Sequence, residues 1–132
     1  MLKKQKKRSD VLILEILSGI EDVKGEKINL LDLREIDNSF CEYFIICNGT
    51  SNTHVTAIVN SINRMVSRSI KEKPYHTEGL NNSEWVLIDF VNVVVHVFQE
   101  QYREFYKLEE LWGDAKQTKI AWNNKKINER EK

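Results

Sequence analysis

The chain has 132 residues, of which 41% are apolar and 30% are charged, a composition typical of one globular domain. Twenty Lys and Arg balance twenty Asp and Glu, giving a formal net charge of zero. A duplex-DNA binder needs a basic field, and a membrane-spanning helix needs about 20 consecutive apolar residues. Neither feature is present, so we expect no DNA partner and no membrane partner.

The two ends of the chain differ from its middle. Residues 1–8 contain the run `KKQKKR`, which we interpret as a solvated basic tail, with a minor contact to ribosomal RNA as the alternative. Residues 9–112 carry the apolar patterning expected of the domain. Residues 113–132 form a polar C-terminal extension, and its end, `NNKKINEREK`, is expected to be frayed or disordered.

Two cysteines indicate the compartment. Cys41 and Cys47 lie six positions apart in one expected strand, which would place their Cα atoms about 20 Å apart, too far for a disulfide. We therefore expect reduced core cysteines and a cytoplasmic location. The lack of a transit-type leader also favours a bacterial cytoplasm.

Apolar spacing predicts an alternation of helices and strands. In chain order these are a helix over 9–23, strands over 27–33 and 41–50, a helix over 51–73, an optional short strand, strands over 83–90 and 91–98, and a helical segment over 100–112. Ser51 or Asn52 is the expected cap of the second helix, and Pro74 ends that segment. The order predicts an α/β domain in which a small mixed β-sheet packs against helices.

The segment `SEWVLIDFVNVVVHVF` combines polar and apolar residues in an expected hairpin with a short turn. Alternation places the valines at 93, 95 and 97 on a core-facing side, and Trp85, Asp89 and His96 on the mixed sides. An Asp89–His96 hydrogen bond would make a satisfied polar pair at the edge of the core. The same residues could instead form a partner-binding face with a Trp anchor. Catalysis is the weakest reading, because no nucleophile accompanies them.

Motifs for enzyme chemistry are missing. The histidines and cysteines lack the spacing of a zinc site, and `NGTSNT` lacks the second glycine and the lysine of a phosphate loop. Ser51 fits a helix cap better than a nucleophile, with anion binding at that helix start as the alternative. A nucleotidyltransferase would need two carboxylates close together on a strand beside the Gly-Thr-Ser turn. We expect no catalytic residue, no metal and no cofactor.

Several blocks in the same order carry a family resemblance. The segments `DLREIDNSFCEYFIICNGTSNTHVTAIVNSI` and `EGLNNSEWVLIDFVNVVVHVFQEQYREFYKLEELW` closely resemble the ribosomal silencing factor family, also called Iojap-like. The resemblance implies a nucleotidyltransferase-like fold without catalytic carboxylates, and no enzymatic activity. It also implies binding to the large ribosomal subunit through its L-fourteen ribosomal protein. A member of the family blocks joining of the small subunit and represses translation under nutrient limitation, as in stationary phase.

The resemblance also assigns partner-binding residues. Trp85 falls where the family has its interface tryptophan, and the other matching positions are Asp89, His96, Tyr106, Leu108 and Glu109. The chain departs from the family pattern at Thr53, where a basic residue is usual. It departs again at 90–92, where Phe-Val-Asn replaces a Gly-Asp turn. Both departures put local contacts in doubt.

Two alternatives remain. One is a dimeric interaction domain with another partner, and the other is a nucleotide-binding enzyme or nucleotidyltransferase. A homodimer is expected in either binding hypothesis, because aromatic residues such as Tyr102, Phe105 and Trp112 would remain exposed on a lone domain.

Overall fold

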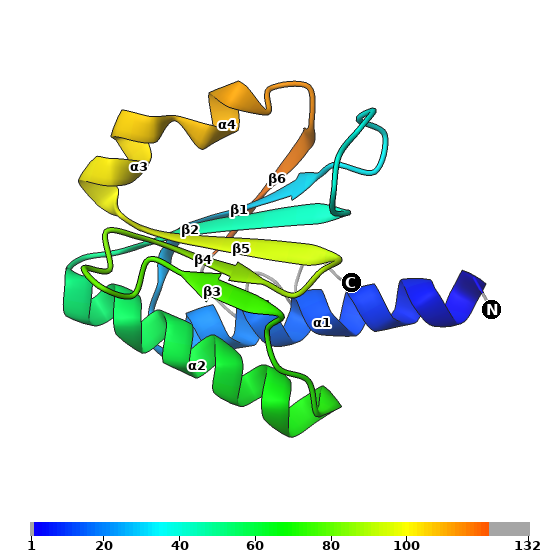
Figure 1. Ribbon diagram of the computed structural model, residues 1–132, viewed down its shortest axis with the longest axis horizontal. Coiled ribbons are helices and arrows are strands. Elements are labelled where there is room, and N and C mark those ends of the chain that lie inside the picture. The colour runs from blue at the N-terminus through cyan, green and yellow to red at the C-terminus, as the bar shows by residue number, and fades with distance from the viewer. Residues whose placement is uncertain (1, 122–132) are drawn as a thin grey trace.

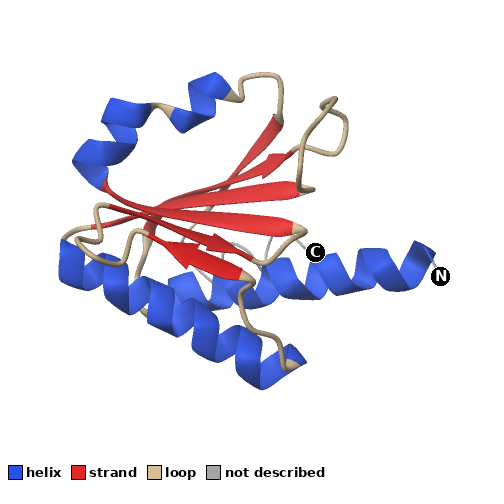
Figure 2. Ribbon diagram, viewed as in Figure 1, coloured by secondary structure: helices blue, strands red, loops and turns tan. Residues whose placement is uncertain are grey.

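The computed structural model describes residues 2–121, with side chains from Ser9 onward, so the expected disorder of the final ten residues lies outside the described part. The elements are α1 (Leu2–Asp22), β1 (Glu26–Asp32), β2 (Tyr43–Gly49), α2 (Asn52–Ile70), β3 (His76–Glu78), β4 (Trp85–Asp89), β5 (Val93–Gln99), α3 (Glu100–Tyr106), α4 (Leu108–Leu111) and β6 (Lys116–Ile120). Figure 2 shows the strands as one layer between two sets of helices.

The sheet has six strands in the order β3-β4-β5-β2-β1-β6. Strands β2 and β5 are parallel neighbours near its centre, and the other neighbouring pairs are antiparallel. A parallel pair needs a crossover connection, which α2 provides between β2 and the β4–β5 hairpin. The predicted mixed α/β fold, the strand–helix unit and the hairpin are confirmed.

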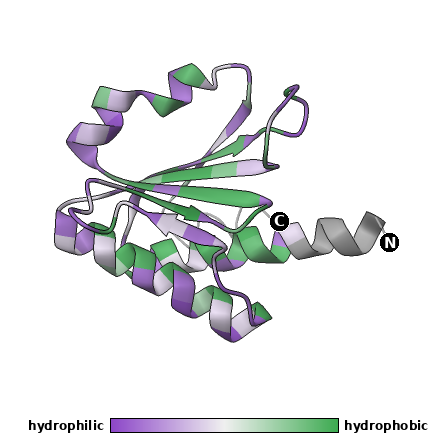
Figure 3. Ribbon diagram, in the orientation of Figure 1, coloured by the Kyte–Doolittle hydropathy of each residue, from purple (hydrophilic) through white to green (hydrophobic). Residues whose placement is uncertain are grey.

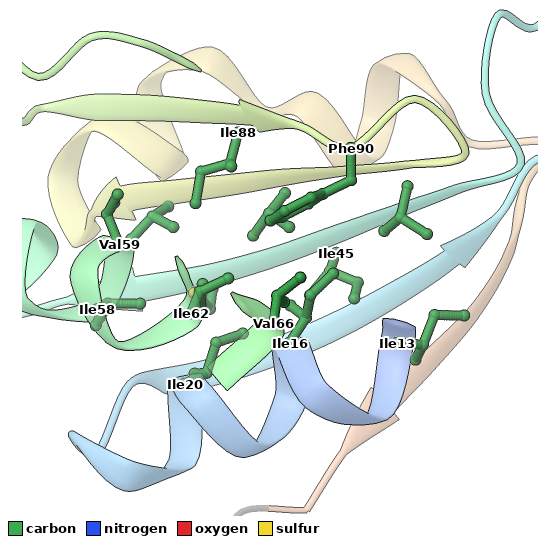
Figure 4. Packing of buried hydrophobic residues seen from close by; sticks show 14 of the residues in the cluster. Ile13, Ile16, Ile20, Ile45, Ile58, Val59, Ile62, Val66, Ile88 and Phe90 are labelled. Carbon is green, nitrogen blue, oxygen red and sulfur yellow. The ribbon is translucent and has the colours of Figure 1, made fainter. Parts of the chain in front are cut away.

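Helices α1 and α2 cover one face of the sheet (Figure 1). Their apolar residues meet those of the sheet in the larger core, where Ile16, Ile20, Ile58 and Ile62 are fully buried against strands that include Ile45 (Figure 4). The valines at 93, 95 and 97 belong to this core, as predicted from their alternation. Burial of apolar area on this scale is the dominant favourable term in folding.

A second, smaller core lies on the other face of the sheet, under α3 and α4. It contains Phe44, Ile46, Phe98 and Leu108, with Trp85 partly buried against it. Figure 3 shows the central strands as largely hydrophobic, because their side chains pack into a core on each face of the sheet. A strand buried on both sides reads as a continuous apolar run, which is the pattern of β2 and β5.

Three expectations about local structure need correction. Helix α1 begins at Leu2, so the segment expected as a tail continues the helix. Strand β6 lies inside the expected polar extension and pairs with β1. Its residues before Ile120 are all exposed along the sheet edge, so the strand has no apolar alternation that could predict it. Cys41 precedes β2 rather than lying in it, although both cysteines are free and buried as expected.

Helices α1 and α2 cross in very close contact at Gly19. A Cβ atom at Gly19 would lie 2.7 Å from the Cα of Ile62. The Ser61 hydroxyl donates to the Gly19 carbonyl at 2.7 Å in the same buried crossing. The main chains therefore approach more closely than any side chain at position 19 allows.

We expect Gly19→Ala to lower the free energy of unfolding by roughly 2–3 kcal/mol, because the added methyl forces the two helices apart. Urea denaturation followed by circular dichroism measures this change. Ser18→Ala is the matched control, since Ser18 is exposed one position earlier on the same helix. Equal stability of the two variants would show that the crossing is not tightly packed.

Candidate partner-binding face

The sheet face opposite α1 and α2 carries a cluster of aromatic side chains, here called the aromatic face and defined by Trp85, His96, Phe98 and Tyr106. Trp85 stacks on Phe98 with ring centroids 4.9 Å apart and lies 4.8 Å from the ring of Tyr106. Strand pairing explains the first contact, since Trp85 is directly opposite Phe98. The indole is thus held in one orientation while staying partly exposed.

His96 supports this indole from below. The Trp85 Nε1–H donates to His96 Nδ1 at 3.1 Å, which leaves the imidazole proton on Nε2. His96 is only 3% exposed, and burial lowers its pKa to about 3. The residue is therefore a neutral acceptor for Trp85 rather than a proton-transfer group near pH 7.

We expect the His96 ring resonances to show no protonation step between pH 5 and 8. Protonation would place a charged imidazolium in a site shielded from water and would break the hydrogen bond from Trp85. Two-dimensional NMR of the ¹⁵N-labelled histidine rings measures this directly. A titration midpoint above pH 5 for His96 would contradict the buried neutral state.

Asp89 does not pair with His96. The hairpin register places Asp89 opposite Val94 and His96 opposite Leu87. Asp89 Oδ1 instead accepts from the Val91 backbone N–H at 2.7 Å and closes the hairpin turn. The expected Asp89–His96 hydrogen bond is therefore replaced by two separate bonds, one to Trp85 and one to the turn.

Tyr106, Leu108 and Glu109 occupy very different environments. Tyr106 is 48% exposed beside Trp85, whereas Leu108 is buried in the smaller core. The Glu109 carboxylate accepts from Arg103 Nε at 3.1 Å and Nη2 at 2.6 Å, and from Asn29 Nδ2 at 2.8 Å. Leu108 and Glu109 thus fasten the helices to the sheet, while Tyr106 is accessible.

Arg103 completes this fastening. Its Nη1 donates to the Lys27 carbonyl at 2.6 Å and to Asn48 Oδ1 at 3.0 Å, so one guanidinium joins α3, α4, β1 and β2. Its side chain is only 11% exposed. The planar fork of an arginine suits this bidentate pairing, which a lysine could not reproduce. Sequence analysis missed Arg103 because its partners are far apart along the chain.

We expect Glu109→Gln to lower the free energy of unfolding at pH 7 by about 1–2 kcal/mol. The hydrogen bond from Arg103 holds the Glu109 pKa below its ordinary value. The ionised carboxylate therefore contributes stability above pH ~4.3, the pKa of Glu109 in the unfolded chain. That contribution is lost as the pH falls through the lower pKa of the folded chain. Denaturant titrations at pH 7 and pH 3 should show the difference from wild type shrinking in acid.

Glu104→Gln is the control, because Glu104 is exposed on the neighbouring turn. If Glu109→Gln lowers the free energy of unfolding by the same amount at both pH values, the ionised carboxylate does not have this role.

A groove lies beside the aromatic face. It encloses about 590 Å³ and is lined by Phe40, Phe44, Tyr75, Leu87, Asp89, Val91, Val94, His96, Leu108 and Trp112. Phe40 and Tyr75 are 78% and 80% exposed at its rim. Neither residue could be recognised from the sequence, since each is a single aromatic residue in a polar loop.

The start of α2 has the features of a helix cap. The Ser51 hydroxyl accepts from the His54 backbone N–H at 3.1 Å, as predicted. The His54 ring accepts from the Thr50 N–H at 2.9 Å and donates to the Val23 carbonyl at 2.7 Å. The adjoining hollow is lined by asparagine, threonine, serine, alanine and leucine side chains, with no carboxylate among them. The side chains at this helix start therefore cap α2 and connect it to the end of α1.

Within residues 2–121, no three His, Cys, Asp or Glu side chains are grouped so that they could hold a metal ion. No helix in the same range is long and apolar enough to cross a membrane.

A family model described as ribosomal silencing factor during starvation matches residues 5–132. The chain belongs to the ribosomal silencing factor family. A family member from Bacillus subtilis is 41% identical over 105 residues, covering 78% of this chain and 86% of the relative. The mouse protein named mitochondrial assembly of ribosomal large subunit protein 1 is 35% identical over 75 residues, which cover 55% of this chain and 33% of that protein.

A crystal structure of a Chromobacterium violaceum protein shares the fold of this chain. It superposes with a TM-score of 0.74 at 33% identity and covers 79% of this chain and 85% of that chain. The expected family and fold are confirmed.

Proposed function

We propose that this protein binds the large ribosomal subunit at its subunit-joining surface, through the L-fourteen ribosomal protein, and blocks joining of the small subunit. It represses translation in this way when nutrients are limiting, and it acts in the cytoplasm. The observation that carries the proposal is the aromatic face, where Trp85 is held rigidly and Tyr106 is accessible. Aromatic anchors fixed before binding are typical of the residues that dominate interface energy.

The mechanism we propose is steric and needs no catalysis. The histidine of the aromatic face, His96, is held neutral by burial and accepts a hydrogen bond from Trp85. Leu108 and Glu109 support the surface from beneath, whereas Asp89 shapes the turn beside it. In this proposal Trp85 and Tyr106 make the principal contacts.

We also propose that the free protein forms a homodimer. Phe105 and Leu111 are each 75% exposed on α3 and α4. Exposed apolar side chains on adjacent helices favour association with another copy.

We expect Tyr106→Ala to weaken binding to isolated large subunits about tenfold or more, because it removes an accessible aromatic contact without emptying the core. Co-sedimentation through a sucrose cushion measures binding, and gradient profiles of mixed subunits measure joining. Trp85→Ala should show the same loss, with some loss of stability from its broken bond to His96.

Leu14→Ala is the control, because Leu14 is 58% exposed on α1 in the opposite helix layer. If Tyr106→Ala, Trp85→Ala and Leu14→Ala all bind like the wild type, the aromatic face is not the interface.

A further inference from the structure

A second cavity lies between the strands β1, β2 and β6 and the helices α3 and α4. It encloses about 510 Å³, which is within the range of small-molecule sites. No described residue lines both this cavity and the groove beside the aromatic face. The cavity is therefore a separate site, and neither Trp85 nor Tyr106 takes part in it.

Asn29, on β1, brings an unsatisfied acceptor to this cavity. The residue is 1% exposed, and its Nδ2 donates to Glu109 Oε2 at 2.8 Å and to Gln117 Oε1 at 3.0 Å. Both amide protons are thus used, and the amide cannot be turned round, because the Glu109 carboxylate only accepts. Asn29 Oδ1 is left buried with no hydrogen-bond partner within residues 2–121. Such an acceptor is costly, so the site favours a molecule that brings a donor.

The charges around the cavity are balanced except at two residues. Four of the six charged residues that line it form ion pairs with one another. Lys119 and Glu104, both exposed, form no ion pair with any described residue. Lys119 is directly opposite Asn29 in the sheet, so the two side chains extend from the same face. An unpaired cation and an unpaired anion beside a buried acceptor complement a molecule that carries both charges.

Access to the acceptor depends on β6, the edge strand that borders the cavity. Its Gln117 and Lys119 are exposed, and the Gln117 side chain joins Asn29 Nδ2 to the Glu109 carbonyl. Exposed side chains change rotamer within nanoseconds, so these two can turn aside for a small molecule.

We propose that this cavity binds a free α-amino acid with an aliphatic side chain. The ammonium of the ligand donates to Asn29 Oδ1, and its carboxylate pairs with Lys119. Its side chain lies against Ile120, a partly buried residue that lines the cavity. The proposal goes beyond the proposed function and does not depend on it, because it uses no residue of the aromatic face.

Other small ligands fit the lining less well. A nucleotide would bring more negative charge than the one unpaired lysine offsets, next to the carboxylate of Glu104. A diamine would place a second ammonium against Lys119 and leave that lysine without a partner. A zwitterion satisfies the acceptor and both unpaired charges at once.

NMR titration of the ¹⁵N-labelled full chain with L-leucine tests the site. We expect saturable shifts of the Asn29 side-chain amide and of the Lys119 backbone amide. L-leucinamide lacks the carboxylate and N-acetyl-L-leucine lacks the ammonium, so each should bind roughly five- to tenfold more weakly than L-leucine.

Lys119→Gln tests the ion pair without disturbing the core. Lys119 is exposed on an edge strand, so the urea midpoint should not change. Binding of L-leucine should weaken roughly fivefold, whereas binding of L-leucinamide, which has no carboxylate, should stay the same. Lys116→Gln is the matched control, because Lys116 is exposed on the opposite face of the same strand, and it should bind L-leucine like the wild type.

Three results would overturn the proposal. The first is that L-leucine, L-isoleucine and L-valine all leave the Asn29 side-chain amide unshifted. The second is that L-leucinamide binds the wild type as tightly as L-leucine does, or that Lys119→Gln weakens both equally. The third is tighter binding of 1,4-diaminobutane or inorganic phosphate than of L-leucine, which would assign the cavity to another class of ligand.

Discussion

The parallel pairing of β2 with β5 is the constraint on which the rest of the structure depends. Seven residues of each strand are in register, from Tyr43 opposite Val93 to Gly49 opposite Gln99. Because these strands run the same way, the chain must cross over through α2, which lies on one face of the sheet and packs there against α1. Strand β5 continues directly into α3. Helix α3 lies on the sheet face opposite α1 and α2, where the aromatic face is found.

The sequence predicted the parts of the fold that depend on local apolar spacing. Alternation in `VNVVVHVF` indicated which valines enter the core, and spacing in α2 indicated its buried face. It could not reveal β6, which has no apolar alternation and is held largely by main-chain pairing with β1. It also left an Asp89–His96 pair open as one alternative, because pairing across a hairpin depends on a register that residue types alone do not specify.

The aromatic face is rigid for reasons that involve residues outside it. Trp85 is held by a stacked ring and by a neutral histidine, and Arg103 ties the overlying helices to two strands. The family resemblance implies partner binding by Trp85 and Tyr106 and equally by Leu108 and Glu109, but Leu108 is buried and Glu109 is bonded to Arg103 and Asn29. Only the burial and hydrogen bonds of the folded chain distinguish these residues, since all four lie in the same family-like segment of the sequence.

The two edges of the sheet are poorly suited to pairing with strands of another chain. One edge is β3, only three residues long, and the other is β6, which carries Lys116 and Lys119 along an exposed strand. Short edges and edge lysines oppose strand-to-strand addition and therefore fibril-like growth. In the homodimer proposed above, the two copies would therefore meet through side chains rather than through strand edges.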